Sequence, residues 1–197
     1  MYKASYFQIY NIGIFGSSGK KVRQYEPAGR IYHQAASAGG KVYMWGGTAN
    51  TQDISRSSQL VTTIEVFDHS IETWKQFVAE GSPHPGAYSV ACTSSGNQLF
   101  AYGGLDGRKW RGVLSKLDVD TLTWSMLSTE TPSGPMRKWE CDIVYFHGGK
   151  LALFGGYGLP TNPIQPGSSF IKDSKLFSDG MGWSNEFHTF DLGRNTQ

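Results

Sequence analysis

The chain has 197 residues, of which 25 are glycine and 14% are aromatic, and its formal net charge is +2. This length is enough for one domain that buries most of its apolar surface, and the glycine and aromatic content is typical of a turn-rich all-β protein. The weak charge argues against a nucleic-acid-binding or membrane-binding surface, and no apolar run is long enough to predict a transmembrane span.

The N-terminus lacks a charged region followed by an apolar core, so we expect no signal peptide. The two cysteines, Cys92 and Cys141, are too few for a disulfide framework, and the sequence has no Asn-x-Ser/Thr sequon. We expect both cysteines to be small, buried thiols. Together these features favour a reducing compartment, the cytosol or the nucleus.

Residues 1–28 do not fit the pattern that follows them. A short strand at 6–10 could be the outer strand of a partial preceding unit, and the Gly- and Ser-rich stretch at 16–21 is typical of a flexible turn. The alternative is a leader without fixed structure. The sequence leaves both interpretations open.

Three repeats follow, and they share four landmarks. These are an opening strand, an apolar strand that ends in Gly-Gly, a strand that ends in Asp, and a Trp. The first repeat spans residues 29–80. Its opening strand is 30–36, its apolar strand is 42–45 followed by Gly46 and Gly47, its third strand is 64–67 followed by Asp68, and its Trp is Trp74. In the second, 81–132, they are 87–92, 99–102 with Gly103 and Gly104, 114–117 with Asp118, and Trp124. In the third, 133–197, they are 138–145, 151–154 with Gly155 and Gly156, and 186–190 with Asp191, and we expect this repeat to end before its Trp.

The spacing of these landmarks identifies the fold. The glycine doublets follow one another at steps of 57 and 52 residues, and Trp follows Asp by six residues in both of the first two repeats. A period near 50 with one Gly-Gly per unit is typical of kelch blades in a β-propeller. We therefore predict an all-β, kelch-type propeller that is incomplete, with about three blades of an expected six.

The repeated residues have structural interpretations. The apolar run before each doublet indicates a strand buried on both faces between neighbouring blades. Glycine at the end of that strand permits unusual backbone angles and a close approach between blades. We expect Asp68 and Asp118 to bond backbone amides in the turn that follows, and Trp74 and Trp124 to cover apolar surface between blades.

Nothing in the sequence predicts a catalytic centre, a metal site or a cofactor. No histidine has metal-ligand spacing with another His or Cys, and the segment 16–20 resembles a phosphate-binding loop only superficially. Copper-radical oxidases also use kelch propellers, but the Tyr and His ligands of their metal are not identifiable here. We expect a non-catalytic binding module, with an oxidase as the remote alternative.

Binding is expected at the loops on one face of the propeller. The loop after the second doublet, 105–112, contains Arg108 and Trp110, a combination that suits peptide or carboxylate contacts. The alternative is a solvated loop in which Trp110 packs on its neighbour. The loop after the third doublet, 157–185, is long and mixes prolines with aromatic anchors, which favours an ordered, functional segment.

The third repeat carries a closer resemblance. Its segment 151–158, the long loop and the segment 182–191 together resemble the kelch-domain substrate receptors of cullin-2 ubiquitin ligases. Those receptors recognise peptide C-termini that typically end in glycine. The resemblance covers roughly residues 29–192; it is specific in the third repeat and generic in the first two.

This resemblance implies a deep pocket on the loop face that holds a peptide C-terminus. Tyr157 and Trp183 take the positions of two pocket aromatics of the family, and Lys138 corresponds to a pocket lysine. The chain departs from the family at Thr48, where an aromatic is usual. The family's carboxylate-binding arginines and serine, and its elongin-binding element, lie in later parts of the chain that are absent here.

Two further expectations follow from this interpretation. The alternative to a ligase receptor is a non-ligase kelch scaffold that binds a folded cytoskeletal or trafficking partner. Because three blades cannot close a ring, we also expect residues 1–197 alone to expose an apolar flank and to be aggregation-prone, oligomeric or marginally folded.

Overall fold

The computed structural model describes residues 25–48, 63–81, 88–105, 110–129, 134–161, 164, 166–172 and 180–193. All regular secondary structure in these residues is β-strand, which confirms the predicted all-β class. Residues 1–24, for which the sequence left open both a partial blade and a leader, lie outside this description. No helix within it is long and apolar enough to cross a membrane.

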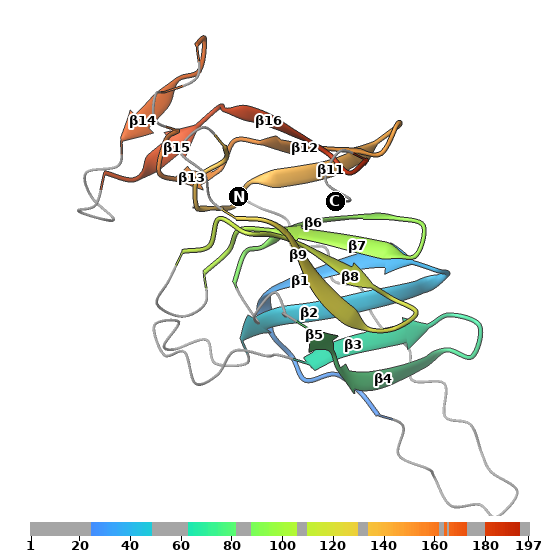
Figure 1. Ribbon diagram of the computed structural model, residues 1–197. Coiled ribbons are helices and arrows are strands. Elements are labelled where there is room, and N and C mark those ends of the chain that lie inside the picture. The colour runs from blue at the N-terminus through green and yellow to red at the C-terminus, as the bar shows by residue number, and fades with distance from the viewer. Residues whose placement is uncertain are drawn as a thin grey trace, which may run out of the picture.

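Three antiparallel sheets lie next to one another like the blades of a propeller (Figure 1). Blade I has the order β1 (Ile31–Ala38), β2 (Lys41–Thr48), β3 (Thr63–Asp68) and β4 (Thr73–Val78). Blade II contains β6 (Ala91–Ser95), β7 (Gln98–Tyr102), β8 (Leu114–Asp118) and β9 (Thr123–Ser128), with β5 (Glu80–Gly81) added in parallel to β9. Blade III contains β11 (Asp142–Phe146), β12 (Lys150–Phe154) and β16 (Phe187–Asp191).

A fourth, small sheet lies at one end of blade III (Figure 1). Its order is β10 (Lys138–Trp139), β13 (Tyr157–Gly158), β15 (Gly182–Ser184) and β14 (Phe170–Lys172). We call it the rim sheet. Because β10 precedes β11, β13 follows β12 and β15 precedes β16, the rim sheet continues blade III towards its loops.

The core consists of two apolar clusters on either side of blade II. Successive side chains of a strand point to opposite faces, so Leu99 and Ala101 of β7 pack against blade I, while Phe100 and Tyr102 pack against blade III. All four are at most 3% exposed. The prediction of a strand buried on both faces is therefore confirmed for β7.

The same prediction is wrong for the end of β12. Phe154 is 54% exposed, and its neighbours Val144 and Phe187 are also mostly exposed on the same face of blade III. The physical reason is that this face points away from blade II, and no described residue packs a further blade against it. An apolar flank is thus present, as the sequence predicts; the aggregation expected from it stays a prediction.

The opposite flank, on blade I, is polar where residues 25–30 cross it. Glu65 of β3 is fully buried and accepts hydrogen bonds from Arg30 Nη2 at 2.9 Å and from the Tyr25 hydroxyl at 2.7 Å. The Gln76 amide adds a third, at 3.0 Å. The two outer flanks therefore differ. On the blade I flank, the charged side chains are hydrogen-bonded to one another, whereas the blade III flank exposes apolar side chains.

The glycine doublets have the backbone that their position predicts. All six residues have positive φ, a region that side chains with a Cβ enter only at a cost. At Gly103 a Cβ would clash with the carbonyl oxygen of Lys138, and the adjacent Gly104 N–H donates to that same oxygen at 2.9 Å. The second doublet therefore allows the backbones of blades II and III to meet.

The repeated Asp residues make the hydrogen bonds expected at their turns. Asp68 Oδ1 accepts from the Ser70 hydroxyl at 2.6 Å and from the Ser70 N–H at 3.0 Å, and Asp118 Oδ1 accepts from the N–H groups of Thr121 at 3.0 Å and Asp120 at 3.1 Å. These contacts hold the pKa of both carboxyl groups below their usual value.

The two repeated tryptophans differ in what they cover. Trp124 of β9 is 3% exposed and meets Trp45 of blade I edge-to-face, with ring centroids 5.9 Å apart. It covers the boundary between blades as predicted. Trp74 instead packs on Phe67 of its own blade, at 5.1 Å, and is half-buried on the flank that faces away from blade II.

Candidate functional site

The rim sheet brings a row of aromatic side chains together. Cross-strand pairing places Trp139 opposite Tyr157, and Tyr157 opposite Trp183. The ring centroids of these pairs lie 5.8 Å and 5.1 Å apart, and Trp110 joins the row at 4.8 Å from Trp139. All three contacts are edge-to-face, the arrangement that aromatic quadrupoles favour.

The members of this row differ in their access to solvent. Tyr157 is fully buried, Trp110 and Trp139 are half-buried, and Trp183 is 43% exposed. Ile171 of β14, which pairs with Trp183, is also largely exposed. Tyr157 therefore supports the exposed ring of Trp183 from beneath, and Trp183 and Ile171 form the apolar surface that a ligand could reach.

A buried ionic network lies within the same sheet. Lys138 Nζ is 2.5 Å from Glu186 Oε2 and donates to Ser184 Oγ at 2.6 Å. The other oxygen of Glu186 accepts from both the N–H and the hydroxyl of Thr161, at 2.8 Å and 2.5 Å. The side chains of Lys138 and Glu186 are each only 1% exposed, so the pair depends on this full set of hydrogen bonds to offset the loss of water.

The hydrogen bonds of this network lower the pKa of Glu186. Burial by itself would raise the pKa of Glu186, but the hydrogen bonds from Lys138 and Thr161 outweigh it and lower that pKa to about 2. His188, whose Nε2 lies 3.8 Å from Glu186 Oε2, has its pKa lowered by burial. Both groups therefore favour folding more strongly at neutral pH than in acid.

We expect acid to destabilise the protein in two steps. The contribution of His188 is lost as pH falls below its ordinary pKa of 6.5, because the unfolded chain then binds a proton more readily than the folded one. The contribution of Glu186 is present above pH 4.5 and lost as pH falls towards 2. The second step should amount to about 3 kcal/mol of unfolding free energy. Urea titrations from pH 7 to pH 2 measure it. Glu186→Gln should flatten the curve below pH 4.5; an unchanged slope would contradict this assignment.

The predicted peptide-binding residues are not all in one place. Lys138, Tyr157 and Trp183 share the rim sheet, and Trp110 reaches it through Trp139. Arg108 lies outside the described residues, as does most of the loop after the first doublet. Lys138 is buried and paired with Glu186, so a ligand would meet Trp183 before it met the lysine.

Sequence reasoning did not assign a role to Trp139, Thr161 or Glu186. Trp139 links Trp110 to Tyr157. The only feature of the sequence that indicated a role for it is its position directly after Lys138. Glu186 and Thr161 come together across 25 residues of chain, and no spacing rule connects them. Their roles follow only from the pairing of β12 with β16 and of β13 with β15.

Neither cysteine has the low pKa of a reactive thiol. Burial raises the pKa of the Cys92 thiol to about 11 and that of Cys141 to about 12. Both are therefore thiols at neutral pH, with low nucleophilicity. Among the described residues, no group of three His, Cys, Asp or Glu side chains could hold a metal ion.

Comparison with models of known protein families identifies the family to which these repeats belong. The KLHDC2/KLHL20/DRC7 Kelch-repeats domain matches residues 7–156. The chain belongs to this kelch-repeat family. The match ends at Gly156, directly before Tyr157. It confirms the predicted kelch-type fold and supports a module that binds other proteins.

Individual kelch proteins are similar over different parts of the chain. Kelch domain-containing protein 2 of Homo sapiens is 27% identical over 176 residues, which cover 84% of this chain and 42% of that protein. Kelch domain-containing protein 1 of Mus musculus is 31% identical over 107 residues, 53% of this chain and 26% of that protein. Host cell factor of Drosophila melanogaster is 28% identical over 144 residues, 66% of this chain and 9% of that protein. This kelch chain therefore spans less than half the length of the relatives it matches.

Proposed function

We propose that the rim sheet of blade III binds an extended peptide, and that this kelch chain contributes half of a pocket for peptide C-termini. The observation that carries the proposal is the partly exposed ring of Trp183, fixed edge-to-face on the buried Tyr157. Exposed tryptophans supported by a buried partner are typical centres of binding energy in protein interfaces. The resemblance to cullin-2 substrate receptors gives the ligand class.

The buried network beneath the row supports this proposal. Ser184, which accepts from Lys138, directly follows Trp183, and Glu186 is bonded to Thr161 on the far side of the loop. These contacts hold the segment that directly follows Trp183 in place before any ligand arrives. A preorganised site of this kind loses less conformational entropy on binding. In this proposal Lys138 positions the pocket wall and is reached only by a ligand that enters deeply.

The proposal extends to the whole protein. In it, the terminal carboxylate is bound by blades beyond residue 197, and a later region contacts elongin and cullin-2, in the cytosol or the nucleus. The client would then be delivered for ubiquitination. A non-ligase scaffold is the competing interpretation, and co-purification of another partner from cells without elongin and cullin-2 would favour it.

Trp183→Ala tests the site in the complete protein. We expect binding of a peptide that ends in glycine to weaken at least about tenfold, because a large apolar contact is lost. Fluorescence anisotropy of a labelled peptide measures the change, and the same peptide with an amidated C-terminus reports on carboxylate recognition. Ile71→Ala is the control, since Ile71 is an exposed apolar side chain in the turn between β3 and β4, away from the rim sheet. Unchanged affinity in Trp183→Ala, with the fold intact, would sink the proposal.

A further inference from the structure

A second exposed aromatic ring lies at the start of blade I. Tyr32 of β1 is 44% exposed, and its ring meets Tyr88 of blade II edge-to-face, with centroids 6.3 Å apart. Tyr88 itself is buried. An exposed ring fixed on a buried tyrosine is also the arrangement of Trp183 on Tyr157 in the rim sheet. The protein therefore presents two aromatic contact points of the same construction.

Both rings lie at the loop end of the array, where β1 starts and where the rim sheet is found (Figure 1). In each repeat, the first part of the opening strand pairs with the residue directly after the glycine doublet. These pairs are Ile31 with Thr48, Tyr88 with Leu105, and Trp139 with Tyr157. Because the Tyr32 ring contacts blade II, it lies on the inner side of blade I and not on the outer flank of that blade.

A continuous series of contacts joins the two exposed rings. From Tyr32 it passes through Tyr88, Leu105, Trp110, Trp139 and Tyr157 to Trp183. The ring contacts in this series measure between 4.8 Å and 6.3 Å, and directly paired residues are about 5 Å apart, so the path is on the order of 30 Å long. An extended chain rises about 3.3 Å per residue, so about nine residues span this path.

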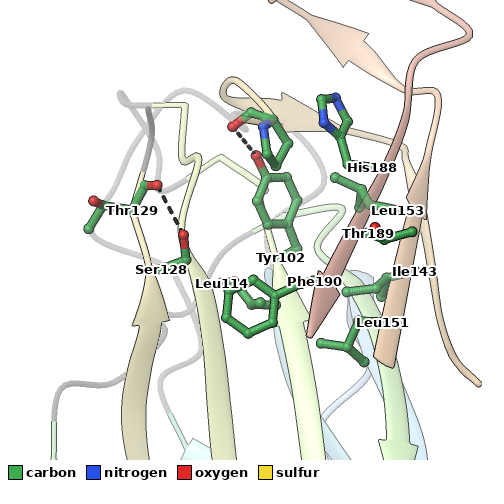
Figure 2. Close-up of a pocket in the computed structure, with 11 residues that line it drawn as sticks. Tyr102, Leu114, Ser128, Thr129, Ile143, Leu151, Leu153, His188, Thr189 and Phe190 are labelled. Atoms are coloured by element: carbon green, nitrogen blue, oxygen red, sulfur yellow. Dashed lines mark hydrogen bonds between the residues drawn. The ribbon is translucent and has the colours of Figure 1, made fainter. Parts of the chain in front are cut away.

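The backbone beneath this series is fixed at both blade boundaries. Between blades I and II, the Ser89 N–H donates to the carbonyl oxygen of Tyr32 at 3.2 Å. Between blades II and III, the Tyr102 side chain (Figure 2) holds the segment that leads into β10, because its hydroxyl donates to the carbonyl oxygens of Pro135 at 2.9 Å and Met136 at 2.7 Å. The two exposed rings are therefore held at a fixed separation before a ligand binds.

The conformation of Tyr32 is unfavourable for so large a side chain. Its φ is 58°, in the left-handed region that residues with a Cβ rarely adopt. Ser89 and Glu140, at the same step of the other two repeats, also have positive φ, but neither has a ring. Because the Tyr32 side chain stays partly in solvent, its own burial offsets only part of this cost. A strained residue with an exposed ring indicates a contact with a ligand.

We propose that the loop face binds a peptide along its length, and that an apolar side chain roughly nine residues before the one at Trp183 packs on the Tyr32 ring. This inference rests on the proposed function, since it extends the same ligand from blade III to blade I. In that function the terminal carboxylate is bound by later blades, so the preceding residues run the opposite way, along the series of contacts. The ligand is then an extended peptide of about a dozen residues or more.

Three labelled peptides test this extension in the complete protein. The short peptide has about six residues and ends in glycine. The leucine peptide adds about ten residues before the same C-terminus, glycine and serine with leucine at every third position, so that one leucine lies close to Tyr32 in any register. The serine peptide replaces these leucines by serine. By fluorescence anisotropy, we expect the leucine peptide to bind at least about fivefold more tightly than the serine peptide, because it buries an apolar side chain on the ring.

Two variants of Tyr32 locate this preference. Tyr32→Gly removes the ring and suits the positive φ, so it tests the contact without adding backbone strain. We expect it to abolish the preference for the leucine peptide and to leave binding of the short peptide within about twofold. Tyr32→Phe keeps the ring and should keep the preference. Trp183→Ala should weaken the short and long peptides alike, since all of them share the C-terminal contact.

The outcomes separate this inference from the proposed function. Equal affinity of the leucine and serine peptides for the unaltered protein, or a preference for leucine that survives in Tyr32→Gly, would overturn the inference and leave the proposed function standing. Failure of the short peptide to bind, or binding that Trp183→Ala does not weaken, would overturn both.

Discussion

Gly103→Ala should lower the free energy of unfolding by more than about 3 kcal/mol. Gly103 has φ +74°, where a residue with a Cβ is strained by about 1–2 kcal/mol, and the added Cβ would clash with the carbonyl oxygen of Lys138. That oxygen is fixed because it already accepts from the Gly104 N–H. Relief of the clash requires the backbones of blades II and III to separate. Urea unfolding, followed by fluorescence, measures the loss.

Gly40→Ala is the matched control for this experiment. Gly40 has nearly the same φ, +76°, but no atom lies within 4 Å of the place that an added Cβ would take. It therefore isolates the backbone strain, and we expect a loss of only about 1 kcal/mol. Equal losses in the two variants would show that close approach between blades is not what requires Gly103.

Lys138→Met should cost about 3–5 kcal/mol of stability, the range found when one partner of a buried ion pair is removed. The substitution keeps the apolar length of the side chain but leaves Glu186 buried without its cation. Thermal or urea unfolding at pH 7 measures the loss. A second expected result is that the pKa of Glu186 rises, because burial is then opposed only by the hydrogen bonds from Thr161.

Two further variants separate a buried pair from an ordinary one. The double variant Lys138→Met, Glu186→Leu should recover a large part of the loss, since no unpaired charge is left behind. Lys41→Met removes a pair of similar composition, Lys41 with Asp68 at 3.3 Å, whose lysine is 45% exposed. We expect that change to be worth less than about 1 kcal/mol. A loss in Lys138→Met no larger than in Lys41→Met would refute the structural role of the buried pair.

These results would also show how Lys138 contributes to peptide binding by the aromatic row of the rim sheet. If Lys138 chiefly holds β10 to β15, then its loss should weaken peptide binding by disordering Trp183 and not by removing a charge that the peptide contacts. Lys138→Met, Glu186→Leu distinguishes the two roles. Recovery of both stability and binding favours support of the pocket wall, while recovery of stability alone favours direct contact with the peptide.

Local patterns in the sequence predict the blades well. Each apolar strand, each doublet and each Asp turn is found where its spacing placed it, because the residues that mark these features are close together in the chain. The positive φ of the doublets and the Asx turns at Asp68 and Asp118 need only a few neighbouring residues. The exposure of Phe154 was not predicted, because burial on that face depends on a neighbouring blade rather than on the strand itself.

One backbone feature had no sign in the sequence. Tyr32, Ser89 and Glu140 have φ of 58°, 49° and 50°, although none is a glycine, and they occur at the same step of the three repeats. In blade I the pairing skips from Ile31 opposite Thr48 to His33 opposite Gly46, which leaves Tyr32 facing Gly47. The register is the same on both sides of Tyr32, so the left-handed residue lies opposite the positive-φ Gly47 with no residue inserted, and this cross-strand constraint is not contained in local propensity.

For this protein, the sequence by itself determined the repeat and the strand order within each blade, because each is set by residues near one another in the chain. Tyr157 and Trp183 were singled out by the resemblance to a receptor family, and the structure places them opposite each other in the rim sheet. Tertiary structure alone decided that Lys138 is paired with Glu186 and that Trp139 joins Trp110 to Tyr157. Each of these depends on which strands become neighbours. Burial and pairing across 25 to 48 residues of chain are properties of the assembled sheets.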